Sequence, residues 1–185
     1  MVKVERKTKE VEIMVKLSLE GGEINVKTEI GFLDHMLTTL AFHAGIGLEL
    51  RAKGDLHVDE HHTIEDAAIS LGRAIRKALQ EKDGIKRFGS AIVPMDESVA
   101  ICGVDVSGRG YFILDGEFGD AGISGENIIH FLDTLCRNSG INVYLQIKGN
   151  NAHHRIESAF KALALSLRQA FQESGEVRSI KGKID

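Results

Sequence analysis

Hydrophobic and polar positions along this chain follow strand-like and helix-like periods in alternation. Apolar residues at every second position predict strands at 11–19 and 24–28, which we interpret as a hairpin turning at Gly21-Gly22. Apolar residues three to four positions apart then predict a helix from about residue 33 to Gly45, a strand at 48–52, and a long helix from 64 to about 82. The first half of the chain is therefore expected to mix strands with two helices.

The same order of elements is predicted again from Gly89 onward. The second series consists of strands at about 90–95, 97–106 and 110–115, a helix at about 124–138, a strand at about 141–148 and a closing helix at about 153–173. Each half should then be an antiparallel-leaning sheet with two helices on one face, which is an α+β arrangement.

Short motifs repeat at intervals of 95 and 92 positions and indicate an internal duplication. The run His-His-Thr-Ile-Glu at 61–65 recurs as His-His-Arg-Ile-Glu at 153–157, 92 positions later. Upstream, the segment 34–40 aligns with 129–135 and places His35 over His130. The interval changes from 95 to 92 because Gly54 to His61 is three residues longer than Gly149 to His153, and this self-similarity predicts two structurally equivalent halves.

The expected boundaries follow from this repeat. We assign 1–87 to the first half, 88–178 to the second and 179–185 to a C-terminal tail that contributes to a substrate site. One proline and the lack of a Gly/Ser/Pro-rich stretch leave no place for a flexible linker, so the halves should form one compact unit.

Composition excludes several classes of function. A chain of 185 residues with 43% hydrophobic content can bury a core, and 23 basic against 27 acidic residues make nucleic acid an unexpected partner. No apolar run has the length of a signal or a membrane span, so a cytoplasmic protein is expected. Cys102 and Cys136 are expected to be buried thiols without a function.

The repeated histidines carry the candidate chemistry. Neighbouring residues on a helix point about 100° apart, so His61 and His62 should serve two different metal ions, and the four-residue spacing favours pairing Glu65 with His61. Repeat-equivalent positions supply eight candidate ligands: His35, His61, His62, Glu65, His130, His153, His154 and Glu157. This set offers four protein ligands for each of two ions and suits manganese, iron or zinc. It leaves open whether one chain completes each site.

Two other classes of protein use similar ligands. A dinuclear phosphate-ester hydrolase is the second hypothesis, although such sites depend on bridging carboxylates and imidazoles predominate here. A metal store or structural module is the third, and it predicts closed coordination without an arginine-lined anion pocket.

Three blocks of this chain resemble the imidazoleglycerol-phosphate dehydratases of histidine biosynthesis. They are the segments 31–37 (GFLDHML), 54–66 (GDLHVDEHHTIED) and 151–157 (NAHHRIE), and the resemblance extends over nearly the whole chain. It implies the removal of water from D-erythro-imidazole-glycerol phosphate to give imidazole-acetol phosphate at a site with two manganese ions. It also implies a four-helix layer between two four-stranded sheets, and a homo-oligomer of 24 subunits with sites between subunits. The length of the chain leaves no room for a fused second enzyme, so a monofunctional member is expected.

The resemblance also assigns roles to residues outside the histidine motifs. Glu10, in a segment similar to the family's Arg-x-Thr-x-Glu, would act as a general acid/base or bind the substrate's hydroxyl groups. Arg87, Arg109, Ser179 and Lys181 match phosphate-binding positions, and Gly110 replaces a frequent proline.

Two further candidates come from helical spacing. Lys161 lies four positions after Glu157 and should project from the same helix face, where it could reach the phosphate. His43 is a weaker candidate for a substrate contact, because eight helical positions rotate it about 80° from His35.

Overall fold

A computed structural model describes residues 1–82 and 84–175 of the chain. The first six elements are β1 (Val2–Lys7), β2 (Val11–Ser18), β3 (Ile24–Lys27), α1 (Gly31–Ala44), β4 (Gly47–Gly54) and α2 (His61–Gln80). The next six are β5 (Phe88–Met95), β6 (Ser98–Asp105), β7 (Tyr111–Asp115), α3 (Gly125–Ser139), β8 (Asn142–Lys148) and α4 (Ala152–Ala170). The two series have the same order, as expected for an internal duplication.

The two sheets share one topology. Their strand orders are β1-β2-β4-β3 and β5-β6-β8-β7. In each sheet the two pairings at one side are antiparallel, whereas β3 with β4 and β7 with β8 are parallel. The α+β class and the antiparallel tendency are therefore confirmed.

The predicted hairpin between 11–19 and 24–28 is wrong. The antiparallel partners of β2 are β4 and β1, a strand that the periodicity did not predict, and β3 instead lies parallel to β4 at the opposite edge. Gly21 and Gly22 have positive φ values of 84° and 141°, and a Cβ atom on Gly47 would lie 2.7 Å from the Gly21 carbonyl oxygen. These glycines direct the chain past the end of β4 rather than back along β2.

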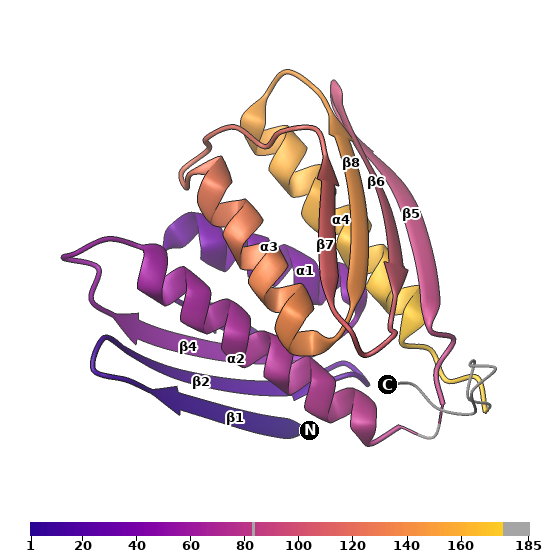
Figure 1. Cartoon of the computed structure of the whole chain (residues 1–185), viewed down its shortest axis with the longest axis horizontal. Coiled ribbons are helices and arrows are strands. Elements are labelled where there is room, and N and C mark those ends of the chain that lie inside the picture. The colour runs from indigo at the N-terminus through magenta and orange to yellow at the C-terminus, as the bar shows by residue number, and fades with distance from the viewer. Residues whose placement is uncertain (83, 176–185) are drawn as a thin grey trace.

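The four helices lie between the two sheets (Figure 1), with α2 against β1 and β2 and α4 against β5 and β6. Helix α1 also contacts α4, and α2 contacts α3, so each helix pair joins one half of the chain to the other. Leu37 and Leu71 from the first half and Phe131 and Phe160 from the second are fully buried. The halves therefore share one hydrophobic layer, which is the main favourable contribution to their association.

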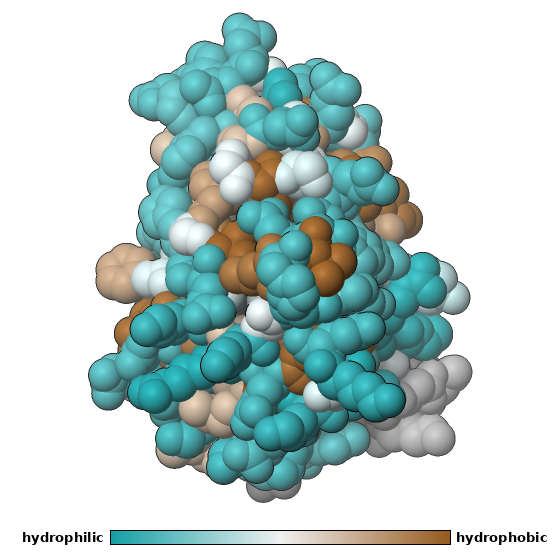
Figure 2. Space-filling view, turned by 90° about the vertical axis from the view of Figure 1, so that its left-hand side faces the viewer, coloured by the Kyte–Doolittle hydropathy of each residue, from teal (hydrophilic) through white to brown (hydrophobic). Residues whose placement is uncertain are grey.

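The outer faces of the sheets differ. That of the first sheet carries charged residues such as Lys3, Glu5 and Arg51, whereas that of the second exposes large apolar side chains. These are Phe88, Ile92, Ile101, Tyr111, Ile113 and Tyr144. The side on which the β4–α2 loop protrudes is mainly hydrophilic, with apolar residues gathered near its centre (Figure 2).

Two of the remaining expectations concern the membrane and the cysteines. Among the residues that the structure describes, no helix combines the length and apolarity needed to cross a bilayer. Cys102 and Cys136 are buried and free, as expected. Burial raises the pKa of Cys102 to about 11 and raises that of Cys136 further, so both remain neutral thiols.

Candidate metal centre

The start of α4 aims two side chains of the second histidine motif toward α1. Asn151 caps the helix by accepting a hydrogen bond from the His154 backbone N–H at 3.3 Å. His153 and Glu157 then lie one turn apart on the helix face that meets α1. On α1, His35 belongs to an exposed stripe with Thr38 and Phe42.

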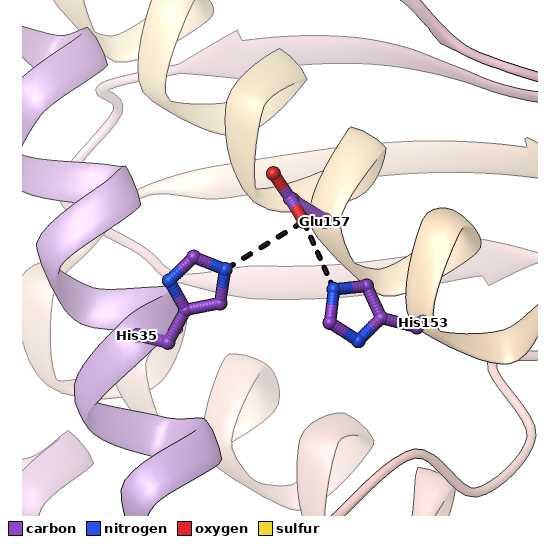
Figure 3. A group of neighbouring side chains, drawn as sticks. All are labelled: His35, His153 and Glu157. Atoms are coloured by element: carbon purple, nitrogen blue, oxygen red, sulfur yellow. Dashed lines mark hydrogen bonds and ion pairs between the residues drawn. The ribbon is translucent and has the colours of Figure 1, made fainter.

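His35, His153 and Glu157 form the first cluster (Figure 3). Glu157 Oε2 lies 3.1 Å from His153 Nε2 and 3.6 Å from His35 Nε2, and Lys161 Nζ approaches Glu157 Oε1 at 2.8 Å. Although burial acts to raise the pKa of Glu157, Lys161 and the two histidines hold that pKa below its ordinary value. Glu157 is therefore an ionised carboxylate beside two imidazoles.

His61, Glu65 and His130 form the second cluster. Glu65 Oε1 lies 3.7 Å from His130 Nε2, and the His61 and His130 rings stack with centroids 4.6 Å apart. His130 Nε2 is buried without a hydrogen-bond partner. Because a buried polar atom is costly when unpaired, this nitrogen fits a ligand atom of a bound cation.

Each cluster combines residues from both halves of the chain. His35 of α1 meets the second histidine motif on α4, and His130 of α3 meets the first motif on α2. In both clusters the ligand atoms lie within 4.8 Å of one another. Each glutamate shares its cluster with the first histidine of its motif, Glu65 with His61 and Glu157 with His153, in line with the helical spacing.

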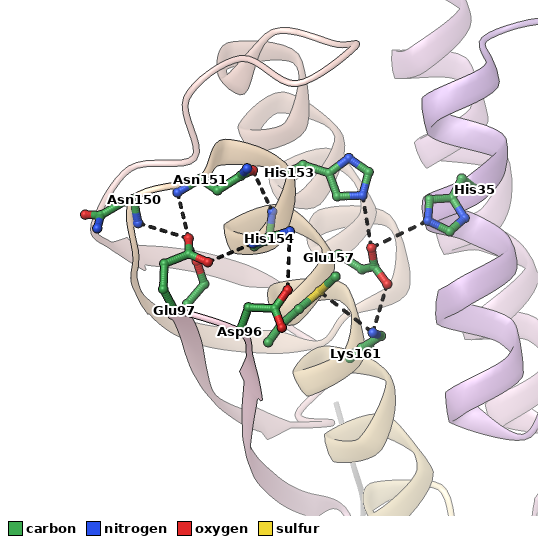
Figure 4. Close-up of polar contacts among 11 residues, drawn as sticks. His35, Asp96, Glu97, Asn150, Asn151, His153, His154, Glu157 and Lys161 are labelled. Atoms are coloured by element: carbon green, nitrogen blue, oxygen red, sulfur yellow. Dashed lines mark hydrogen bonds and ion pairs between the residues drawn. The ribbon is translucent and has the colours of Figure 1, made fainter.

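The second histidine of each motif lies outside these clusters. His62 Nδ1 is 3.1 Å from Asp55 Oδ2 in the β4–α2 loop, and His154 Nδ1 is 2.7 Å from Glu97 Oε2 in the β5–β6 turn (Figure 4). These hydrogen bonds raise the pKa of each histidine. The bond from His154, together with backbone donors, lowers the pKa of Glu97 to about 2. The predicted eight-residue ligand set is thus brought together as two groups of three and two outlying histidines.

The sequence interpretation did not identify Asp55 and Glu97. For Glu97 a signal was present, because the two-residue turns Lys9-Glu10 and Asp96-Glu97 both close the first hairpin of their half. Glu10 and Glu97 therefore occupy equivalent positions. Their registers could be matched only once β1 was known to be a strand.

The remaining predicted residues lie in three places. Lys161 and His43 are close to the first cluster, and burial together with the Lys161 charge lowers the pKa of His43. Arg87 contacts Asp105 at 2.7 Å just before β5, and Arg109 lies between β6 and β7 at the same end of the second sheet. Ser179 and Lys181 lie outside the described residues.

Known proteins resemble this chain over its whole length. The model of the family described as imidazoleglycerol-phosphate dehydratase matches residues 28–167. The imidazoleglycerol-phosphate dehydratase of Archaeoglobus fulgidus is 55% identical over 100% of both chains, and that of Methanothermobacter thermautotrophicus is 46% identical over 97% of this chain and 95% of the relative. A crystal structure of the enzyme from Pyrococcus furiosus superimposes with a TM-score of 0.85 at 39% identity, covering 97% of this chain and 99% of that one. The chain therefore belongs to the imidazoleglycerol-phosphate dehydratase family, which consists of metal-dependent hydro-lyases of histidine biosynthesis.

Proposed function

We propose that this chain removes water from D-erythro-imidazole-glycerol phosphate to give imidazole-acetol phosphate, using two manganese ions held by the two clusters. The observation that carries the proposal is the convergence of two imidazoles and one carboxylate in each cluster. Imidazole with carboxylate suits manganese, and the two thiols are buried and neutral. When bound, the cations would supply positive charge that stabilises the negative charge developing on the substrate's imidazole ring.

Each cluster contains three protein ligands, and the outlying histidines provide one more for each. His62 and His154 belong to neither cluster of their own chain and contact Asp55 and Glu97 instead. We therefore assign one of them from a neighbouring subunit to each cluster. Four ligands per ion would leave coordination positions open for substrate.

The positions of the phosphate candidates also favour sites between subunits. Arg87 precedes β5 and Glu97, the partner of His154, follows it. An eight-residue strand spans about 26 Å, which a small phosphate ester cannot bridge. Arg87 and Arg109 would accordingly bind the phosphate of a substrate held at another subunit's histidines, with Ser179 and Lys181 as further phosphate ligands.

The apolar outer face of the second sheet supports assembly as well. Six large side chains, from Phe88 to Tyr144, are exposed there, and contiguous apolar surface of this kind marks interaction sites. We propose a homo-oligomer of 24 copies, each built of the halves 1–87 and 88–178 with the tail 179–185, located in the cytoplasm.

Glu10 is the proposed acid/base. Its carboxylate is 57% exposed, and the contact that the described structure gives it is with His62 Nδ1 at 4.0 Å. A carboxylate with few partners can accept a proton from the substrate's carbon chain, whereas one held by several donors cannot. Lys161 and His43 would contribute polar contacts to the substrate beside the first cluster.

Removal of metal tests the reaction and the cofactor together. The chain stripped with a chelator should lose dehydration of imidazole-glycerol phosphate, and added Mn²⁺ should restore it with two ions per chain. Product formation and metal content measured on the same samples check this. Activity that persists in metal-free samples would contradict the proposal.

Mixed oligomers test the sharing of sites between subunits. His35→Ala chains should be inactive alone, but coassembly with His62→Ala or His154→Ala chains should restore about one quarter of the sites in one of the two mixtures. In that mixture the chain with the outlying-histidine substitution supplies an intact first cluster, and the His35→Ala chain supplies the outlying histidine. Two inactive mixtures, each with verified coassembly, would show that a single chain supplies all four ligands.

A further inference from the structure

The two outlying histidines are held by carboxylates from different places in the repeat. In the first half, Asp55 of the β4–α2 loop contacts His62 Nδ1. The equivalent position in the second half is Asn150, because Gly54 aligns with Gly149. Asn150 has no carboxylate, and its backbone N–H donates to Glu97 instead.

Glu97 is held more firmly than its repeat equivalent Glu10. Its Oε1 accepts hydrogen bonds from the backbone N–H groups of Asn150 and Asn151 at 3.3 and 2.8 Å and from the Ser98 hydroxyl at 3.0 Å. Its Oε2 faces His154 Nδ1 at 2.7 Å (Figure 4). Four hydrogen-bonding groups therefore surround this carboxylate, whereas the contact that the described structure gives the Glu10 carboxylate is with His62 at 4.0 Å.

This geometry determines which nitrogen of His154 carries the proton. An ionised carboxylate only accepts hydrogen bonds, so Nδ1 of His154 must donate. In the neutral imidazole Nε2 then carries the lone pair, and Asp96 Oδ2 of the β5–β6 turn lies 3.6 Å from it. In both clusters Nε2 is likewise the nitrogen of His35, His153 and His130 that faces the glutamate.

We propose that Glu97 is a positioning residue that fixes His154 with its proton on Nδ1 and its Nε2 available to a cation of the neighbouring subunit. Asp55 does the same for His62. Because Asp55, and not Glu10, holds His62 in the first half, the Glu10 carboxylate can contact the substrate. Hydrogen bonds of this kind orient metal-binding histidines and typically change metal affinity about 10–100-fold. The inference rests on the proposed role of His154 as a metal ligand.

Glutamine at position 97 should reverse the tautomer. Because three donors converge on Oε1, the amide oxygen would occupy that place and the amide NH₂ would face His154. Nδ1 would then have to accept, and the proton would move to Nε2, where it blocks the metal. Alanine at position 97 would remove the hydrogen bond to Nδ1, so that both neutral tautomers of His154 would be populated.

The experiment compares Glu97→Gln, Glu97→Ala and Asp55→Asn in the full chain stripped of metal. Mn²⁺ titrations, followed by the electron paramagnetic resonance of the free ion, should show an affinity lower by about 10–100-fold for Glu97→Gln and by less for Glu97→Ala. Asp55→Asn should show the smallest loss, because both Asp55 oxygens lie within 3.3 Å of His62 Nδ1 and the amide can turn its oxygen inward. A merely structural role predicts the opposite order, with alanine worse than the isosteric glutamine, and that order would overturn the proposal, as would unchanged affinity in Glu97→Gln.

A second measurement needs neither metal nor activity. Solid-state NMR of ¹⁵N-labelled histidine in the metal-free chain should show the His154 proton on Nδ1 in the wild type and on Nε2 in Glu97→Gln. The same tautomer in both proteins would overturn the proposal even if the variant assembles poorly. A separate control tests whether His154 is a metal ligand at all. If it is not, His154→Ala should bind Mn²⁺ as tightly as the wild type.

Discussion

Replacing Glu157 with glutamine is expected to reduce dehydratase turnover more than about 100-fold and to remove one of the two metal ions, since the loss of an outer hydrogen-bond partner alone costs about 10–100-fold. Glu157 Oε2 lies between the Nε2 atoms of His153 and His35. Glutamine keeps the size of the side chain but removes the charge that attracts the cation. It also leaves the Lys161 ammonium beside the cluster without its counter-charge. Steady-state kinetics and metal content per chain, measured together, check both effects.

A matched control separates this effect from a general loss of charge. Glu12→Gln makes the same chemical change on an exposed side chain, where Glu12 pairs with Lys7 at 2.8 Å and belongs to neither cluster. Exposed pairs of this kind contribute little to stability, so activity and metal content should stay unchanged. Full turnover with two ions in Glu157→Gln would mean that the first cluster is not a metal site.

The second large effect is a loss of stability when the packing of α4 against β5 is disturbed. An alanine Cβ at Gly89 would lie 2.0 Å from the Ser166 carbonyl oxygen and 3.1 Å from the Ala170 backbone nitrogen. Backbone atoms of a buried helix cannot move aside at low cost, so Gly89→Ala should lower the free energy of unfolding by about 3 kcal/mol. Because α4 carries His153 and Glu157, metal binding should weaken as well. Chemical denaturation checks the stability, and the comparison variant is Gly103→Ala on the neighbouring strand, where a Cβ would meet nothing within 4 Å.

Gly103→Ala should differ from the wild type by only a few tenths of a kcal/mol, within the range usual for surface changes. Equal stability of the two variants would show that α4 does not approach β5 as closely as the structure indicates. A large loss in Gly103→Ala alone would instead point to the outer face of the second sheet as a tightly packed subunit interface.

The local pattern of apolar, histidine and glutamate residues was sufficient to predict most helices and strands and the kinds of side chain in the two clusters. The three-to-four spacing of apolar residues located α1 and α2, and the spacing of His61 to Glu65 correctly predicted that these two side chains meet. Such signals work because helical neighbours are set by the backbone geometry of one turn. Strand partners are not set in this way. In β1 only Val2 and Val4 are apolar and the other four positions are charged, so the pattern did not predict this strand and paired β2 with β3 instead.

The sequence was sufficient to predict two similar halves, each with a His-His-x-Ile-Glu motif. It was also sufficient to recognise the family that these motifs resemble. The contacts between the halves became visible in the folded chain. His35 meets the second histidine motif and His130 meets the first. His62 contacts Asp55, and His154 contacts Glu97. The physical reason is that these contacts arise where helices of different halves pack and where a strand turn meets a helix start. Apart from His62 and Asp55, which are 7 positions apart, the residues brought together in this way are separated by 57 to 122 positions along the chain, so no local period records their meeting.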